Sequence, residues 1–241
     1  MQIMDEYQTI HHLLVNRASI ARYGDGELKL CLGKSAKSQR ANISMQLRLR
    51  EILMINGGQA NTCLVGIPRI YAKEDKVRMS DRKWSFWKSY AIKKFLELYN
   101  PAKQYGSAFV TRPDAAPAID CAEYFDKVKE LWKDRDVLIM HGEGTGFLKR
   151  KCILETAATS TVLTGPIRDA YSHHQDLMRL LLNHSSNDTV ILLSLGPEAT
   201  VLAFDLAMKG RQALDLGHLG MFYAHIHPKD KNWDGIKREV Y

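Results

Sequence analysis

The sequence predicts an α/β fold of the Rossmann-like kind, with a mainly parallel sheet and helices on both faces. Short apolar runs bounded by glycine or proline alternate with longer segments whose apolar residues recur at helical spacing. Several of the apolar runs end in a glycine turn that opens the next helical segment, as happens in parallel sheets. A chain of 241 residues can bury one large core, so we predict a single domain over residues 1–241.

The expected elements alternate along the whole chain. The strands are short apolar runs, such as DVLIM and TVILLSL, and they cover residues 19–23, 62–67, 105–111, 136–140, 160–163, 189–195 and 212–216. The helices repeat apolar residues every three or four positions, and they cover residues 4–16, 43–55, 84–99, 118–133, 171–183 and 198–209. Gly210 is placed to stop the last of these helices. The polar residues 33–42 predict a loop over the turn that follows the first strand.

Composition and charge narrow the class of protein. With 45% hydrophobic and 25% charged residues the sequence is an ordinary globular one, and its net charge of +7 favours anionic partners. The positive residues are dispersed, so we expect no nucleic-acid partner. No stretch approaches the roughly 18 apolar residues of a membrane span, and the first residues do not read as a secretory leader. Four cysteines without metal-site spacing predict reduced, mostly buried thiols in a cytoplasmic protein: Cys31, Cys63, Cys121 and Cys152.

The turn after the first strand carries the strongest chemical signal. It reads Arg22-Tyr23-Gly24-Asp25-Gly26-Glu27, so two carboxylates lie two positions apart between a strand and a helix. Gly24 and Gly26 remove side chains around Asp25 and would let a ligand approach closely. Hard divalent cations take oxygen ligands and share them with substrate phosphates, so Asp25 and Glu27 are candidate metal ligands and catalytic residues. A capped turn with solvated acids is the structural alternative.

Three later turns also follow expected strands and open helices. The segment Gly142-Glu143-Gly144-Thr145-Gly146 could bind phosphate through its amides. It lacks the Gly-Lys-Ser/Thr of a Walker loop and the spaced third glycine of a dinucleotide fingerprint, which disfavours a nicotinamide dehydrogenase. Gly165-Pro166 and Gly196-Pro197 follow the next two strands, and Pro197 suits the first turn of a helix. The first two turns are predicted to line a nucleotide pocket, with plain tight turns as the alternative.

His218 follows the last expected strand and is the third candidate catalytic residue. It could contact a phosphate or the metal, or it could accept a proton as a base, because its unperturbed pKa lies near neutrality. A purely structural role is the alternative. The short clusters His173-His174 and His225-x-His227 lack acids at zinc spacing, so we interpret both as surface features.

Together these segments resemble a known family. The turn from Arg22 to Glu27, with LGPEATVLAFDL at 195–206 and QALDLGH at 212–218, is similar to the bacterial GT-D-type glycosyltransferases, over roughly residues 17–223. The resemblance implies a Rossmann-like GT-D fold, one glycosyltransferase domain, a UDP-sugar donor and a divalent metal. Manganese is the metal expected first, and magnesium is the second candidate. The family's Asp-x-Glu motif falls on Asp25 and Glu27, and His218 falls beside the donor. The predicted donor-binding positions are Arg22, Gly24, Gly142, Gly144, Thr145, Gly165, Pro166, Gly196 and Pro197.

The sequence departs from the family pattern at one place in the middle of the match. After Gly165-Pro166 the family has an Asn-Ala-aromatic run, whereas this chain has Arg168-Asp169-Ala170-Tyr171.

The residues and the resemblance agree on one chemistry. Cleavage of the anomeric bond of a nucleotide sugar builds negative charge on the leaving UDP, which a metal at Asp25 and Glu27 would offset, with help from Arg22. We expect a metal-dependent hexosyltransferase that moves a hexose from a UDP-sugar to a glycan, glycolipid or glycoprotein acceptor in bacterial surface glycan assembly. It would act in the cytoplasm, with peripheral contact at the inner face of the membrane as an option. The alternatives are a nucleotide-dependent phosphotransferase or hydrolase, and a noncatalytic nucleotide-sugar-binding module.

Overall fold

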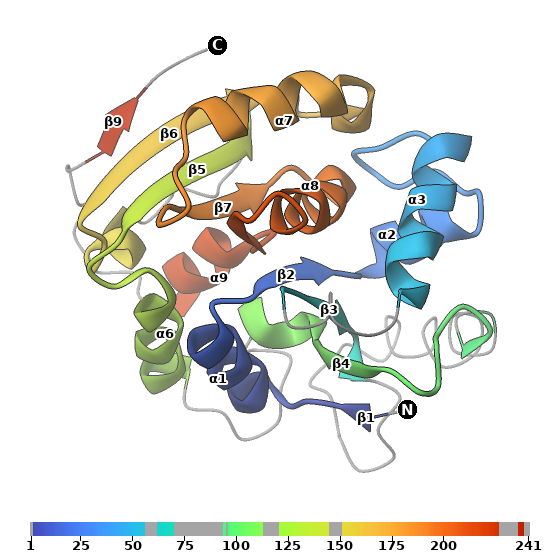
Figure 1. Ribbon diagram of the computed structural model, residues 1–241, viewed down its shortest axis with the longest axis horizontal. Helices are drawn as coiled ribbons and strands as arrows, with labels where there is room; N and C mark the ends of the chain where they lie inside the picture. The colour runs from blue at the N-terminus through green and yellow to red at the C-terminus, as the bar shows by residue number, and fades with distance from the viewer. Residues whose placement is uncertain are drawn as a thin grey trace.

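One parallel sheet organises the chain (Figure 1). The computed structural model describes residues 2–55, 62–69, 94, 96–112, 121–144, 151–226 and 236–238. Within them, nine strands pair in the order β1-β4-β3-β2-β8-β7-β5-β6-β9, and every pair is parallel. The strands are β1 (Gln2–Ile3), β2 (Ser19–Arg22), β3 (Cys63–Ile67), β4 (Gln104–Ser107), β5 (Asp136–Gly142), β6 (Thr159–Gly165), β7 (Val190–Ser194), β8 (Gln212–Asp215) and β9 (Ile236–Arg238).

Helices connect these strands and cover both faces of the sheet (Figure 1). The α-helices are α1 (Glu6–Asn16), α2 (Asp25–Cys31), α3 (Ile43–Met54), α6 (Cys121–Lys129), α7 (His174–Asn183), α8 (Pro197–Ala207) and α9 (Leu219–Ile226). Short 3-10 turns add η3 (Ala108–Thr111), η5 (Glu130–Trp132), η7 (Lys151–Leu154) and η8 (Ala170–His173). The predicted fold class, a Rossmann-like sheet with helices on both sides, is confirmed.

The core is divided into two clusters, one on each face of the sheet. Alternate residues of one strand enter different clusters: Ile20 of β2 packs with α1 and α6, whereas Ala21 packs with α3 and α8. The same alternation holds along β7, where Ile191 and Leu193 face α8 and Leu192 faces the opposite side. This is the period of two that a strand buried on both faces requires.

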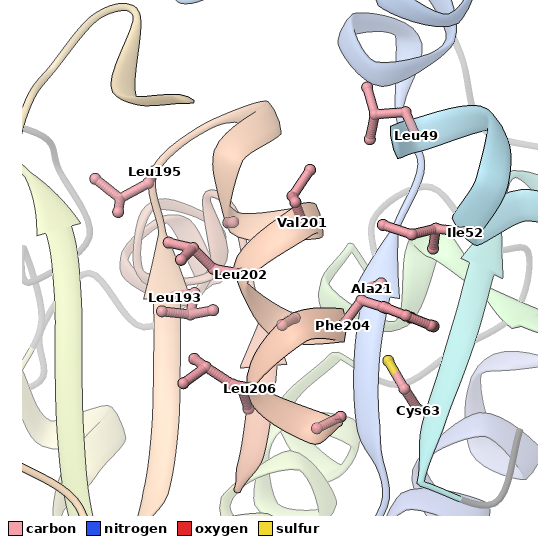
Figure 2. Close-up of a cluster of buried hydrophobic side chains, with 14 of the residues drawn as sticks. Ala21, Leu49, Ile52, Cys63, Leu193, Leu195, Val201, Leu202, Phe204 and Leu206 are labelled. Atoms are coloured by element: carbon pink, nitrogen blue, oxygen red, sulfur yellow. The ribbon is translucent and has the colours of Figure 1, made fainter. Parts of the chain in front are cut away.

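Helix α8 is the centre of the first cluster. Almost all of its side chains are buried, including two on opposite sides of the helix, Leu202 and Phe204. In Figure 2, Leu202 lies on the side of α8 toward Leu193 of β7, and Phe204 lies on the side toward Cys63 of β3. A helix enclosed in this way fixes the turn at its N-terminus firmly against the sheet.

Several predicted boundaries move for identifiable reasons. The strand expected at 105–111 ends at Ser107, because the hydroxyl of Ser107 accepts a hydrogen bond from the amide of Phe109 at 3.0 Å and starts the turn η3. Most of the helix expected at 84–99, and residues 145–150, lie outside the described residues. The strands β1 and β9 and the helix α9 were not predicted.

Two further expectations concern the thiols and the membrane. Cys31 and Cys63 are buried free thiols, and burial raises the pKa of each to about 12, so both stay protonated at neutral pH. None of the helices within the described residues is long and apolar enough to cross a membrane.

Candidate functional site

Because all the strands are parallel, the turns that leave their carboxyl ends share one edge of the sheet. Strand β2 lies between β3 and β8, so the turn that carries Asp25 is next to the turn that carries His218. The turn at Gly196 leaves β7, the next strand along. This edge is where sheets of this type bind their ligands.

The two acids of the first turn point in different directions. Helix α2 begins at Asp25, and Gly24 is its N-cap. The carboxylate of Glu27 folds back and accepts a hydrogen bond from the amide of Gly24 at 2.7 Å. The side chain of Asp25 is exposed and pairs with Lys29 at 2.9 Å, one turn along the helix. Asp25 is therefore free to turn toward a ligand at little cost, since an exposed ion pair of this kind is weak.

Negative charge is concentrated around Glu27. Burial of its carboxylate, together with the negative charges of Asp215 and then Asp25, raises the pKa of Glu27 to about 7, although hydrogen bonds from backbone amides oppose the shift. Three carboxylates from β8 and from one turn of α2 therefore lie within electrostatic reach of each other.

Arg22 holds this part of the sheet edge together. Its Nε donates to the carbonyl of Asp215, and its Nη2 contacts Oδ1 of the same residue at 3.3 Å. Its Nη1 donates to the carbonyl of Ala108 at 2.9 Å and to the hydroxyl of Thr111 at 2.7 Å. The hydroxyl of Thr200 donates to Oδ2 of Asp215 at 3.1 Å. Arg22, predicted as a donor-binding residue, thus joins the ends of β2, β4 and β8 through hydrogen bonds within the protein.

The turn between β8 and His218 is shaped by this arginine. Gly217 has a φ of +51°, and a side-chain carbon there would collide with Nη2 of Arg22. A residue with a side chain would be both strained and blocked at this position. The glycine therefore lets the chain pass over Arg22 and bring His218 to the same edge as Asp25.

His218 lies in a positive environment. The side chain of His218 is exposed. Desolvation of its ring by the surrounding protein, followed by the positive charges of Arg22, Arg112 and Lys37, nevertheless lowers the pKa of His218, and the negative charge of Asp215 opposes this shift. Arg112 stacks over the ring of Phe222, with its guanidinium carbon 4.3 Å from the ring centre. A neutral imidazole beside these cations suits an anionic ligand better than a cationic one.

The turn Gly196-Pro197 lies directly against the first turn. A side-chain carbon at Gly26 would lie 3.7 Å from Cγ of Pro197 and 3.5 Å from Cβ of Ala36. Gly196 has a φ of +58°, and a side-chain carbon there would lie 2.6 Å from the hydroxyl of Ser38. The predicted loop over the first turn is thus confirmed, and residues 33–42 cover both turns.

The remaining predicted positions form a second group at the ends of β5 and β6. Gly142 and Gly165 are paired across the two strands, and the amide of Glu143 donates to the carbonyl of Gly165 at 3.0 Å. Gly144 has a φ of +68°, and a side-chain carbon there would meet no atom of the described residues within 4 Å. Pro166, which follows Gly165, is half-buried. Thr145 lies outside the described residues. Strand β5 is three strand spacings of about 4.8 Å from β2, so one ligand that reached both groups would lie across the ends of β8 and β7.

The carboxylate oxygens of the turn after β2 suit a hard divalent cation. Asp25 and Glu27 offer carboxylate oxygens, and the crowding of negative charge around Glu27 is what a cation would relieve. No group of three or more His, Cys, Asp or Glu side chains in the described ranges is arranged to hold a metal ion. A metal held by these two acids would take its other ligands from a substrate and water, as magnesium and manganese sites with substrate phosphates do.

A second ionic cluster was not predicted. Nδ1 of His174 contacts Oε1 of Glu198 at 2.7 Å, and its Nε2 contacts Oδ2 of Asp205 at 3.2 Å. Arg48 of α3 also pairs with Asp205. The interpretation of His174 as a surface feature is therefore wrong, while His173 is exposed as expected. The sequence did contain a signal for this cluster. Glu198 and Asp205 are the acids of the apolar helix α8 and lie two turns apart on one side, and buried acids need partners.

His174 gives a pH-dependent contribution to stability. Burial alone would lower its pKa, but the hydrogen bonds that His174 donates to Asp205 and Glu198, and the negative charges of these two acids, outweigh burial and raise the pKa of His174 to about 9. A histidine whose folded pKa is raised stabilises the folded state fully below its ordinary value of 6.5, and this stability is lost as the pH rises through about 9. We expect the loss to be about 2–3 kcal/mol.

The measurement is the free energy of unfolding in denaturant at pH 6 and at pH 10, for the parent and for His174→Gln. The parent should lose more stability than the variant over this interval, because the variant has no imidazolium to deprotonate. Equal losses in the two proteins would show that His174 is not protonated in the folded state.

An all-parallel sheet with acids, glycine turns and a histidine at its carboxyl edge defines this chain as a Rossmann-like α/β protein with a ligand site at that edge. The chain belongs to the glycosyltransferase GT-D fold family, whose model matches residues 20–232.

Similar proteins support the same family. The chain is 29% identical to "Probable glycosyl transferase Gly" of Streptococcus gordonii over 94% of this chain and 35% of that protein. It is 25% identical to "Glycosyltransferase GlyD" of Streptococcus pneumoniae serotype 4 (strain ATCC BAA-334 / TIGR4) over 97% of this chain and 30% of that protein. The chain thus spans about a third of the length of these curated relatives.

Solved structures agree with the fold. The structure called "A New Glycosyltransferase (DUF1792) from Streptococcus sanguinis" superposes with a TM-score of 0.82 at 26% identity, covering 100% of both chains. A second, called "The highly conserved domain of unknown function 1792 has a distinct glycosyltransferase fold", gives a TM-score of 0.83 at 25% identity, covering 100% of this chain and 96% of the other.

Proposed function

We propose that this chain transfers a hexose from a UDP-sugar to a glycan, glycolipid or glycoprotein acceptor, with a divalent metal held by Asp25 and Glu27. The observation that carries the proposal is the position of these two carboxylates at the end of β2, with the positive residues around His218 on the neighbouring turn. Negative oxygen ligands beside positive groups form the pairing that a metal-bound diphosphate needs. The proposal extends to a cytoplasmic role in bacterial surface glycan assembly, with peripheral membrane contact where the acceptor is a lipid.

The metal would supply Lewis-acid stabilisation of the charge that develops on the departing diphosphate. The side chains of the protein would bind and position the metal and its ligand. The exposed side chain of Asp25 can turn from Lys29 to the ligand, and the carboxylate of Glu27 is already fixed by the amide of Gly24. Of the two acids, Glu27 is already positioned and could stabilise the transition state without reorganising, whereas Asp25 would first have to leave Lys29.

His218 contributes as a neutral group beside the anion. Its lowered pKa leaves the imidazole uncharged at neutral pH, so it can donate one hydrogen bond to a phosphate oxygen or accept a proton from an acceptor hydroxyl. The phosphate role has more support, because Arg22, Arg112 and Lys37 make this side of the site positive.

The test is a donor screen. The protein is incubated with a panel of UDP-sugars, with manganese or magnesium and with mixed glycan acceptors, and free UDP and inorganic phosphate are measured separately. UDP release that needs the metal and yields a glycosylated acceptor supports the proposal. Release of inorganic phosphate would support a phosphotransferase or hydrolase, and tight UDP binding without turnover on any acceptor would support a binding module.

A further inference from the structure

The loop of residues 33–42, which joins α2 to α3, is built into the sheet edge. Ala36 lies next to Gly26 at ordinary contact distance, and Ser38 approaches Gly196 so closely that a side-chain carbon at Gly196 would lie 2.6 Å from the hydroxyl of Ser38. The loop therefore lies against both the turn that holds the two acids and the turn that opens α8.

Asp169, in the segment after β6, fastens this loop. Its Oδ1 accepts a hydrogen bond from the amide of Arg40 at 2.7 Å, and its Oδ2 contacts Nε of Arg40 at 2.7 Å. Its own amide donates to the carbonyl of Ser38 at 2.8 Å. Next to it, the amide of Tyr171 donates to Oε1 of the buried Gln39 at 3.3 Å. Three consecutive loop residues are thus tied to one short segment of chain.

The backbone of Asp169 adopts an uncommon conformation in making these contacts. Its φ is +52°, in the left-handed region that residues with side chains rarely adopt, asparagine and aspartate being the more frequent exceptions. Such a conformation persists where the surrounding contacts determine it. The bonds from Arg40 to Asp169 are the contacts that do so, and they also lower the pKa of Asp169, which keeps the carboxylate ionised.

The loop carries a positive charge to the site. Lys37 stands between Ala36 and Ser38, the two residues that touch the catalytic turns, and its side chain is exposed. Its charge is close enough to lower the pKa of His218. The loop thus adds a cation to the side of the site where the diphosphate of the proposed donor would lie.

We propose that the loop of residues 33–42 forms part of the donor site, that Lys37 contacts the diphosphate of the nucleotide, and that Asp169 is a positioning residue that holds Lys37 in place. This deepens the proposed function and rests on it, because the ligand is the diphosphate of the donor. The fastening of the loop by Asp169 can be measured without any ligand.

The experiment combines nucleotide binding with digestion of the loop. The dissociation constant of UDP is measured by calorimetry with manganese for the parent, Lys37→Gln, Asp169→Ala, Asp169→Asn and the double variant with Lys37→Gln and Asp169→Ala. Trypsin cleavage after Lys34, Lys37 and Arg40 is followed without nucleotide for the parent and the Asp169 variants. Asp188→Ala is the matched control, because it removes a surface ion pair to Arg17, a residue with a φ of +46°.

The proposal predicts a defined pattern. Lys37→Gln should weaken UDP binding about tenfold, the size of one charge-assisted hydrogen bond. Asp169→Ala should speed cleavage of the loop and weaken UDP binding by a similar factor, and the double variant should be no weaker than either single one, because both act through one contact. Asp169→Asn should restore most of the protection and the affinity, since an amide oxygen can still accept from Arg40 and asparagine tolerates a positive φ. The control should match the parent.

Three results would each overturn a different part of the proposal. If the parent binds UDP and Lys37→Gln binds it equally well, Lys37 does not contact the diphosphate, and the proposed function stands. If the parent neither binds UDP nor releases it from any donor, the proposed function fails. Unchanged cleavage in Asp169→Ala shows that Asp169 does not hold the loop, whatever the ligand.

Discussion

Replacing Asp25 by Asn, or Glu27 by Gln, is expected to lower the turnover number for sugar transfer at least about 100-fold, because each change removes a charged oxygen from the proposed metal site. The fold should survive both changes. Asp25 is exposed, and a glutamine at position 27 can still accept the hydrogen bond from the amide of Gly24. The measurement is UDP release with a saturating donor and manganese, alongside thermal unfolding of each variant.

The matched control for these variants is Lys29→Ala. It breaks the ion pair of Asp25 but leaves both carboxylates in place, so turnover should stay within about twofold of the parent, since an exposed pair contributes little. Full turnover of the parent in excess chelator, or normal turnover of both acid variants, would remove Asp25 and Glu27 from the mechanism.

Replacing Arg22 by Met is expected to destabilise the protein by about 3–5 kcal/mol, because the change leaves the buried carboxylate of Asp215 without its charged partner. The melting temperature should fall by about 10 °C for a chain of this size. Adding Asp215→Asn to this variant should recover part of the loss, since a neutral amide is less costly to bury than an unpaired charge. The measurement is unfolding in denaturant of both single variants and the double variant.

Arg179→Met provides the comparison, since the pair of Arg179 with Asp176 is exposed on both sides and should be worth less than about 1 kcal/mol. This experiment also decides what Arg22 does. If Arg22→Met unfolds at the same denaturant concentration as the parent and only UDP binding is weakened, Arg22 is a phosphate contact and not the structural link between β2, β4 and β8.

Much of the fold follows from local patterns. The strands that are buried on both faces leave apolar runs such as 136–140 and 190–194, and these were predicted closely. The short strands β1 and β9 have two and three residues and leave no such pattern. The strand expected at 105–111 was too long because a single hydroxyl, that of Ser107, diverts the backbone into η3.

The residues of the candidate site could be proposed from the sequence only where a single turn contains them. Asp25 and Glu27 are two positions apart, and parallel strands bring the turns at Gly196 and His218 to the same edge. The pairing of Arg22 with Asp215, and of His174 with Glu198 and Asp205, joins residues from different elements. The acids of the apolar helix α8 indicate that a partner is needed, but no spacing in the sequence identifies that partner, because the fold has to form before the side chains meet.

The pairing of β2 with β8 means that the candidate site cannot be assembled from nearby residues alone. Arg22 and Asp215 are 193 positions apart, so the guanidinium of Arg22 meets Asp215 only after the ribosome has made the whole segment between them. Until then, a nascent chain would carry Asp25 and Glu27 on a sheet whose centre lacks one neighbour and the helix α8 that covers it. Contacts so distant in sequence slow folding, and one edge of β2 stays unpaired in that interval.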